Sequence, residues 1–211
     1  MALAPSGEQF EIGFGEQRAV VVEVGGGIRS YADGDRDVLE PYAENAMCDG
    51  GHGAPLIPWP NRLADGAYAF DGQSYQLPIT EVAKNNASHG LLRWQNWRCL
   101  ERESARVRLG IRLHPVPGYP FLLDVAIDYV LDENGLTVTT TATNRGTTAC
   151  PYASGQHPYL SPGGDAVDNA TLHLDAATWI DTDNPRQLPT GTAPVAGTDR
   201  DFRIPRLISR Q

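Results

Sequence analysis

The sequence predicts an all-β protein built as a sandwich or a barrel. Three observations carry this prediction. Apolar residues alternate with polar ones in several runs, turn signals rich in Gly, Pro, Asn and Asp separate these runs, and helical periodicity is weak. Many short strands joined by such turns are typical of sandwiches and barrels.

The first half of the chain contains one buried strand and one hairpin. Residues 19–24 are apolar except for Glu23, and such a run is typical of a buried strand. Residues 67–70 and 73–77 flank the dipeptide Asp71-Gly72. Because Asp-Gly tolerates the positive φ that a tight turn needs, these two runs are expected to pair as a hairpin.

The middle of the chain has the clearest alternation. Apolar side chains recur at every second position in residues 107–113, 121–131 and 136–142. This period predicts strands with one buried face and one face in water. The third run is rich in β-branched residues, which suit a pleated surface. Asn134-Gly135 separates the last two runs and predicts a second tight turn.

The other segments give weaker signals. Residues 37–47 have room for a turn or two of helix, but Pro41 interrupts them. Residues 171–174 are expected to form a strand, and residues 183–198, rich in Pro, Thr and Gly, a long surface loop. Residues 201–207 read like sequence from the middle of a domain, with neither a closing strand nor a solvated tail.

Composition limits the class of partner. With 211 residues and no visible internal boundary, residues 1–211 are expected to form a single domain with a sizeable core. A net charge of -9 and a sequence pI near 4.9 disfavour nucleic acid and anionic membranes, because their phosphates would be repelled. A neutral ligand such as a sugar is permitted. Oligomeric state is not predicted.

The absence of certain sequence features bears on the cellular location and the metal content. No apolar run approaches the roughly 20 residues that span a bilayer, and the N-terminus lacks the basic start and apolar core of a secretory signal. Cys48, Cys99 and Cys150 are an odd count without C-x-x-C spacing, so reduced thiols are expected instead of disulfides or zinc. No histidine pair has metal-ligand spacing. We therefore expect a cytoplasmic protein without a metal.

Two polar and aromatic segments, residues 55–97 and 152–160, are candidates for chemistry. Each has a histidine beside a residue that constrains the backbone, in His89-Gly90 and His157-Pro158. Histidine suits proton transfer because its ordinary pKa lies near neutrality. Arg62, which follows Trp59-Pro60-Asn61, offers several donors to ligand hydroxyls. Aromatic rings pack on the apolar face of a sugar, and the candidates are Trp59, Trp94, Trp97 and Tyr159.

Each of these residues also has a structural interpretation. A histidine in a polar loop is usually solvated, Arg62 alone fits an ion pair, and Trp94 and Trp97 fit a core. The remaining histidines are expected to have no role in catalysis: His52 in a flexible Gly-rich loop, His114 at a strand end and His173 on an exposed strand position.

Taken together, the motifs favour the functional interpretation of these residues over the structural one. Asn61-Arg62, an Asp-Gly hairpin, His89-Gly90 and His157-Pro158-Tyr159, in this order, resemble the aldose 1-epimerase (galactose mutarotase) family. The resemblance extends from about Gly13 to Arg203, and the run HGLLRWQNW is especially similar to bacterial members.

The resemblance implies a large antiparallel β-sandwich of the galactose mutarotase type that binds an aldose sugar in a groove. It implies interconversion of the α and β anomers of hexoses such as glucose or galactose, without a cofactor. By resemblance, His157 is the general acid toward the ring oxygen, His89 binds and polarises the same region, Arg62 contacts sugar hydroxyls and Tyr159 lines the site.

The sequence departs from the family at its end. The family's base is a glutamate near the C-terminus, and a sugar-binding aspartate lies shortly before it. Both positions would fall after Gln211, and no earlier motif matches them. We therefore expect a sandwich that is incomplete at the C-terminus, with impaired activity. The alternative is a non-catalytic carbohydrate-binding module. A phosphorylated sugar is a further variant, which would need a basic cluster such as Arg93 and Arg98.

Overall fold

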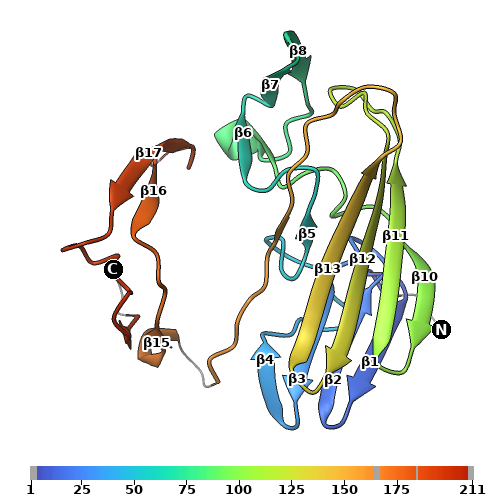
Figure 1. Cartoon of the computed structure of the whole chain (residues 1–211), viewed down its shortest axis with the longest axis vertical. Helices are drawn as coiled ribbons and strands as arrows, with labels where there is room; N and C mark the ends of the chain where they lie inside the picture. The colour runs from blue at the N-terminus through green and yellow to red at the C-terminus, as the bar shows by residue number, and fades with distance from the viewer. Residues whose placement is uncertain (1–3, 164–166, 184, 209–211) are drawn as a thin grey trace.

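The computed structural model describes residues 4–163, 167–183 and 185–208 of the chain. Within these residues the structure consists of strands, turns and two short 3-10 helices, η1 (Val82–Lys84) and η2 (Val167–Asn169). This confirms the all-β prediction. Two four-stranded sheets form the body of the molecule (Figure 1).

Each of the two sheets is a meander in which every strand pairs antiparallel with the next one in the sequence. Such pairing needs only short turns between neighbours. The first sheet consists of β1 (Gln9–Phe14), β2 (Gln17–Val22), β3 (Ile28–Asp33) and β4 (Arg36–Leu39). The second consists of β10 (Arg98–Glu103), β11 (Arg106–Leu113), β12 (Leu123–Asp132) and β13 (Gly135–Asn144).

The period-two runs are confirmed as strands of these sheets. Residues 107–113 and 136–142 lie within β11 and β13, and β12 begins two residues later than the run at 121–131. The apolar run at 19–24 largely coincides with β2.

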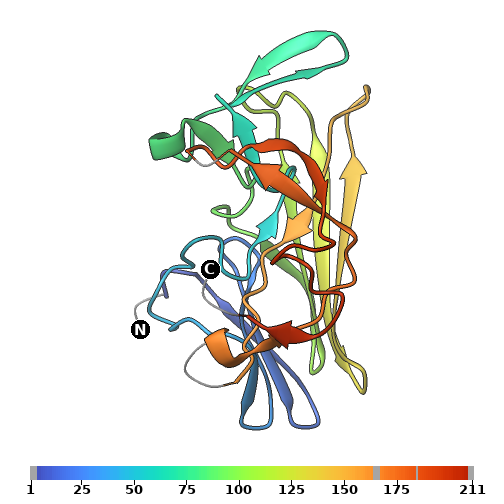
Figure 2. The same ribbon diagram turned by 90° about the vertical axis from the view of Figure 1, so that its left-hand side faces the viewer.

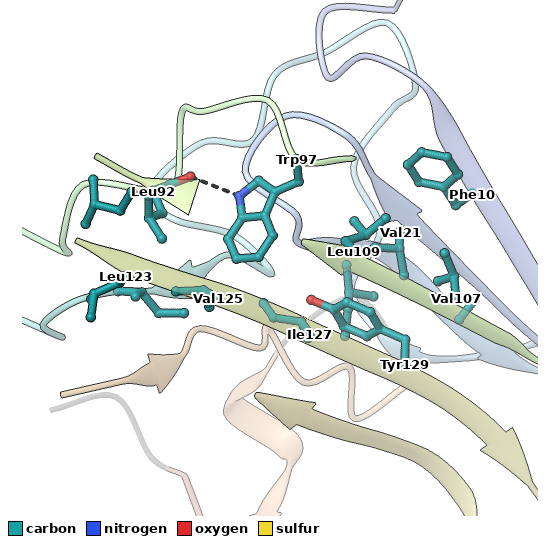
Figure 3. Close-up of a cluster of buried hydrophobic side chains, with 14 of the residues drawn as sticks. Phe10, Val21, Leu92, Trp97, Val107, Leu109, Leu123, Val125, Ile127 and Tyr129 are labelled. Atoms are coloured by element: carbon teal, nitrogen blue, oxygen red, sulfur yellow. Dashed lines mark hydrogen bonds between the residues drawn. The ribbon is translucent and has the colours of Figure 1, made fainter. Parts of the chain in front are cut away.

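The core lies between the two sheets (Figure 3). Alternate side chains of β12 are buried, and the intervening ones are partly exposed. Phe10 and Val21 of the first sheet and Leu109 of β11 belong to the same cluster. Burying each large aliphatic or aromatic side chain contributes about 1.5–3 kcal/mol, so this alternation fixes which face of each strand turns inward.

Two polar atoms of the core are satisfied by backbone carbonyls. The Tyr129 hydroxyl donates to the Gly26 carbonyl at 2.6 Å, and Trp97 Nε1 donates to the Leu92 carbonyl at 3.2 Å (Figure 3). Trp97 is therefore a core residue. Trp94 remains 47% exposed, so the core interpretation holds for Trp97 and is wrong for Trp94.

Shorter strand pairs connect the two sheets. β5 (Pro55–Leu56) pairs with β14 (Gly155–Gln156), and β6 (Arg62–Ala64) pairs with β9 (Asn86–Ser88). β7 (Ala67–Phe70) and β8 (Gln73–Gln76) form the hairpin predicted at Asp71-Gly72. Both turn residues have positive φ, of 48° and 72°.

The C-terminal strands form two further pairs. β15 (Thr171–Leu172) pairs with β18 (Arg206–Leu207), and β16 (Thr178–Thr182) pairs with β17 (Pro189–Pro194). In Figure 1 they stand to the side of the β10–β13 sheet, and in Figure 2 this side faces the viewer.

Four expectations for weak segments need correction. Residues 183–198 are not one long loop, because they contain β17, whose partner β16 could not be identified from local sequence. Residues 201–207 do reach a short strand, β18. Residues 37–47 contain no helix: β4 ends at Leu39 and an irregular segment follows. Of residues 171–174, only the first two are a strand.

We expect Ile127→Ala to lower the free energy of unfolding by about 2–5 kcal/mol, because the fully buried side chain would leave a cavity between the sheets. Urea unfolding measures the loss. The control is Thr139→Ala on an exposed position of β13, which should change the same quantity by no more than about 0.5 kcal/mol. Equal losses in both variants would contradict this description of the core.

Candidate active site

The segment from Gly53 to Ile57 brings the two candidate histidines together. On one side it pairs with the chain around His157: the Gly53 amide donates to the His157 carbonyl at 2.9 Å, and the His157 amide donates to the Ala54 carbonyl at 3.1 Å. β5 and β14 continue this pairing. On the other side, the Leu91 amide donates to the Ile57 carbonyl at 2.7 Å. His157 and His89 therefore flank one segment.

Gly90 permits the second of these approaches. Its φ is +75°, and a Cβ atom at this position would lie 2.0 Å from the Ile57 carbonyl oxygen. No side chain fits at that distance, because the obstacle is backbone. The glycine of the His-Gly motif is thus required by packing, and it sets the position of His89 next to it.

Arg62 reaches the same place through the β6–β9 pair. Its Cα partner across the pair is Ser88, the residue before His89. Asn61 and His89 also bond reciprocally: the His89 amide donates to the Asn61 carbonyl at 2.8 Å, and the Asn61 amide donates to His89 Nδ1 at 3.2 Å. The backbone of both residues lies in the left-handed region, with φ of 58° and 61°. This conformation is uncommon for residues other than glycine, although asparagine and histidine adopt it more often than most, and the two bonds offset its cost.

The rings of His89 and His157 meet edge to face, with centroids 5.6 Å apart and planes at 89°. Burial and, to a smaller extent, the positive charge of Arg93 together lower the pKa of His89 to about 4. His89 is therefore neutral near pH 7. Since its Nδ1 accepts a hydrogen bond, Nε2 carries the proton and is the atom that can donate to a ligand.

Arg62 is anchored by a carboxylate that sequence analysis did not single out. Arg62 Nε and Nη2 donate to the two oxygens of Glu81, at 2.8 and 3.0 Å. Both side chains are mostly buried, so this is a two-point, partly desolvated ion pair. The bonds from Arg62 hold the pKa of Glu81 at about 2. The ion-pair interpretation of Arg62 is correct, and the pair fixes the guanidinium near His89.

Arg186, between β16 and β17, stabilises the surroundings of this ion pair through further hydrogen bonds. Arg186 donates to the Lys84 and Asn85 carbonyls and to Asn86 Oδ1, at 3.0, 2.8 and 3.1 Å. Asn86 in turn donates to Glu81 at 3.0 Å. Residues more than a hundred positions apart thus share one hydrogen-bond network, which spacing along the chain gives no means to predict.

The four aromatic candidates do not all lie at the site. Tyr159 lies beside His157, with ring centroids 5.3 Å apart. Trp97 is in the core, as described above, and Trp59 packs against the core. Trp94 is exposed and carries the guanidinium of Arg93 over its ring, 5.2 Å from the centroid.

Arg93 adds a cation to the site. Its Nη1 lies 4.0 Å from the place a Gly51 Cβ would occupy, next to the His157 ring, and its charge acts on His89 and Cys48. Within the described residues, its guanidinium makes no ion pair or hydrogen bond. Arg98 lies elsewhere, on the wall of a hollow on the outer face of the β10–β13 sheet. The two arginines do not form the cluster considered for a phosphorylated sugar.

That outer hollow has a volume of about 750 Å³ and is lined by ion-paired residues such as Arg112 and Asp124. Neither the two site histidines nor Arg62 lines it. The site is therefore identified by the convergence of titratable side chains, and not by the volume of a cavity.

The described part of the chain contains no group of three or more His, Cys, Asp or Glu residues able to hold a metal ion. The three cysteines are free thiols. No helix in the described residues is long and apolar enough to cross a membrane.

Comparisons with known proteins agree with these motifs. A family model described as aldose 1-epimerase matches residues 8–211. An uncharacterized protein of Escherichia coli K12, YihR, is 38% identical over 172 residues, which cover 81% of this chain and 56% of YihR. Human galactose mutarotase is 32% identical over 152 residues, covering 69% and 43%.

The fold comparison agrees with the sequence comparison. The crystal structure of an aldose epimerase homologue from C. elegans superposes with a TM-score of 0.84 at 19% identity, covering 95% of this chain and 65% of that one. This likeness shows the mutarotase-type fold that the resemblance implied. The chain spans about half of the length of YihR and of the human enzyme.

Replacing Glu81 by Gln should destabilise the protein at pH 7 by about 1–2 kcal/mol, because the charge-assisted bonds to Arg62 are weakened. A carboxylate whose pKa is lowered on folding stabilises the protein above its unfolded pKa of about 4.3 and loses this contribution as pH falls. The folded pKa is about 2, so the difference between the variant and the wild type should shrink between about pH 5 and pH 2. Urea unfolding at several pH values measures it. Glu133→Gln, on an exposed turn, is the control. A difference that is independent of pH would contradict the ion pair.

Removing the charge of Arg93 should raise the pKa of His89 above its value of about 4. The reason is that a nearby cation disfavours the imidazolium form. The measurement is an NMR titration of histidine ring signals in Arg93→Met. Arg98→Met is the matched control, because Arg98 faces the outer hollow. If the two variants shifted the His89 titration equally, the placement of Arg93 would be wrong.

Proposed function

The chain belongs to the aldose 1-epimerase family, and we propose that it interconverts the α and β anomers of an aldose by acid–base ring opening. One observation carries the proposal. His89 and His157 come from segments far apart in the sequence, yet their rings lie 5.6 Å apart beside an anchored Arg62. A hydrogen-bond donor, a titratable acid and a fixed cation around one position suit a polyhydroxylated ligand with one reacting oxygen.

We take the role of His157 from the family resemblance and that of His89 from its lowered pKa. His157 gives a proton to the ring oxygen as the bond between C1 and that oxygen breaks. A base removes the proton of the anomeric hydroxyl, and C1 becomes an aldehyde carbon. Rotation about the C1–C2 bond exposes the other face of the aldehyde, and closure with the same groups in reversed roles gives the other anomer. Neutral His89 contributes the Nε2–H donor, and Arg62 contributes its remaining donors to the hydroxyls.

The base is the part of the site that this chain does not supply by motif. Glu81 is the carboxylate bound to Arg62, and its pKa of about 2 makes it a weak proton acceptor at neutral pH. Its lone pairs are also engaged by Arg62 and Asn86. Glu81 therefore orients Arg62 in this proposal and does not replace the family's glutamate.

Arg93 favours a second candidate substrate, an aldose that carries an anionic group. Its guanidinium lies beside the histidines and makes no ion pair with a described residue, whereas the charge of Arg62 is balanced by Glu81. A single unbalanced cation suits one phosphate or other anion on the sugar. Neutral and phosphorylated hexoses should therefore both be assayed. The cytoplasmic location stays a prediction.

Polarimetry of freshly dissolved α-glucose, α-galactose and glucose 6-phosphate tests the proposal. The protein should accelerate the approach to anomeric equilibrium for at least one sugar. His157→Ala should lower this acceleration by about 10²–10⁴-fold, the usual contribution of one acid–base group. His173→Ala, an exposed strand-region histidine, should not change it.

Absence of acceleration by folded protein would reject the enzymatic proposal. Saturable sugar binding under those conditions would favour the non-catalytic carbohydrate-binding module. Acceleration that persists in His157→Ala would reject the assignment of the acid.

A further inference from the structure

The glycine-rich loop before β5 packs directly against the His157 ring. Gly51 has φ of +87°, and a Cβ atom there would lie 3.4 Å from Cδ2 of His157. Two residues on, Gly53 bonds to the His157 carbonyl, and its own Cβ position lies 1.9 Å from the Ile28 carbonyl oxygen. The loop is thus fixed between β3 and His157, which contradicts the expectation that His52 lies in a flexible segment.

His52 is the histidine of this loop, and its ring contacts two aromatic rings. It stacks on Tyr159, with centroids 4.1 Å apart and planes at 13°. The ring of Tyr42 also meets the His52 ring edge to face, with centroids 5.2 Å apart. Since the ring centroids of Tyr159 and His157 lie 5.3 Å apart, Tyr42, His52, Tyr159 and His157 form a row of ring contacts that reaches the candidate acid.

A single residue ties this row to the backbone. His52 Nε2 lies 2.6 Å from the Glu40 carbonyl oxygen. A carbonyl only accepts, so Nε2 carries the proton and donates. The amide of Glu40 donates in turn to the Tyr159 carbonyl at 2.8 Å. The orientation of the His52 ring and the path of the His-Pro-Tyr segment are therefore coupled through Glu40.

We propose that His52 is a positioning residue, which holds Tyr159 and through it the ring of His157 in the orientation that the reaction uses. This inference rests on the proposed function for its kinetic consequence. His52 does not pass protons to the site, because its Nε2 proton points at a carbonyl that cannot take it up. The stacked ring is the part that matters, since it fills the space behind Tyr159.

The kinetic test compares two substitutions of His52 with one control. His52→Ala removes the ring and should lower kcat for mutarotation by about tenfold with KM changed by no more than about twofold, because misplaced acids lose rate more than binding. His52→Phe keeps a stacking ring without the hydrogen bond and should stay within about threefold of wild-type kcat. His173→Ala should match the wild type. Wild-type kcat in His52→Ala, or an equal loss in Ala and Phe variants, would overturn the proposal.

A second measurement needs no sugar and separates this proposal from the proposed function. The chain has five histidines, so ring signals of protein labelled with ¹³C at histidine Cε1 can be assigned by single substitutions. His52→Ala should shift or broaden the His157 signal and leave those of His114 and His173 unchanged, whereas His52→Phe should largely restore it. An unchanged His157 signal in His52→Ala would overturn the proposal even if the wild type is active. The expected shift in a protein without mutarotase activity would uphold the positioning and reject only the proposed function.

Discussion

The close backbone contacts of the segment from Gly53 to Ile57 are the constraint on which the rest of the site depends. At Gly53 a neighbouring carbonyl oxygen lies 1.9 Å from the place of a Cβ atom, and at Gly90 the corresponding distance to Ile57 is 2.0 Å. Glycine alone fits these positions, and both adopt positive φ. Because this one segment pairs with the chain around both His89 and His157, backbone hydrogen bonds fix where the two histidines lie.

The electrostatics of the site follow from that placement. His89 is brought into a partly buried position beside Arg93, which keeps it neutral and makes it a donor through Nε2. β6 and β9 place Arg62 beside His89. Glu81 balances the charge of Arg62, and the hydrogen bonds from Arg62 lower the pKa of Glu81. In the proposed function, His157 is the proton donor, His89 the polarising group and Arg62 the fixed guanidinium.

The sequence predicted those features that depend on local pattern. Period-two alternation located β11, β12 and β13, and the ordered motifs pointed to Arg62, His89 and His157. Contacts between distant segments were not predictable. The partner of Arg62 is an ordinary glutamate in an unremarkable run, and Arg186 reaches the same network from a region that composition assigned to a loop. His52 gave no signal because its stacking partner follows it by more than a hundred residues.

We propose that the histidines on either side of the Gly53–Ile57 segment form a sugar site. The most direct test is a titration of protein labelled with ¹³C in its histidine rings with galactose, glucose and glucose 6-phosphate. The account predicts that the signals of His89 and His157 move together and saturate with at least one of these sugars, while those of His114 and His173 do not move. Saturable shifts confined to other histidines, or none with any of the sugars, would contradict the account.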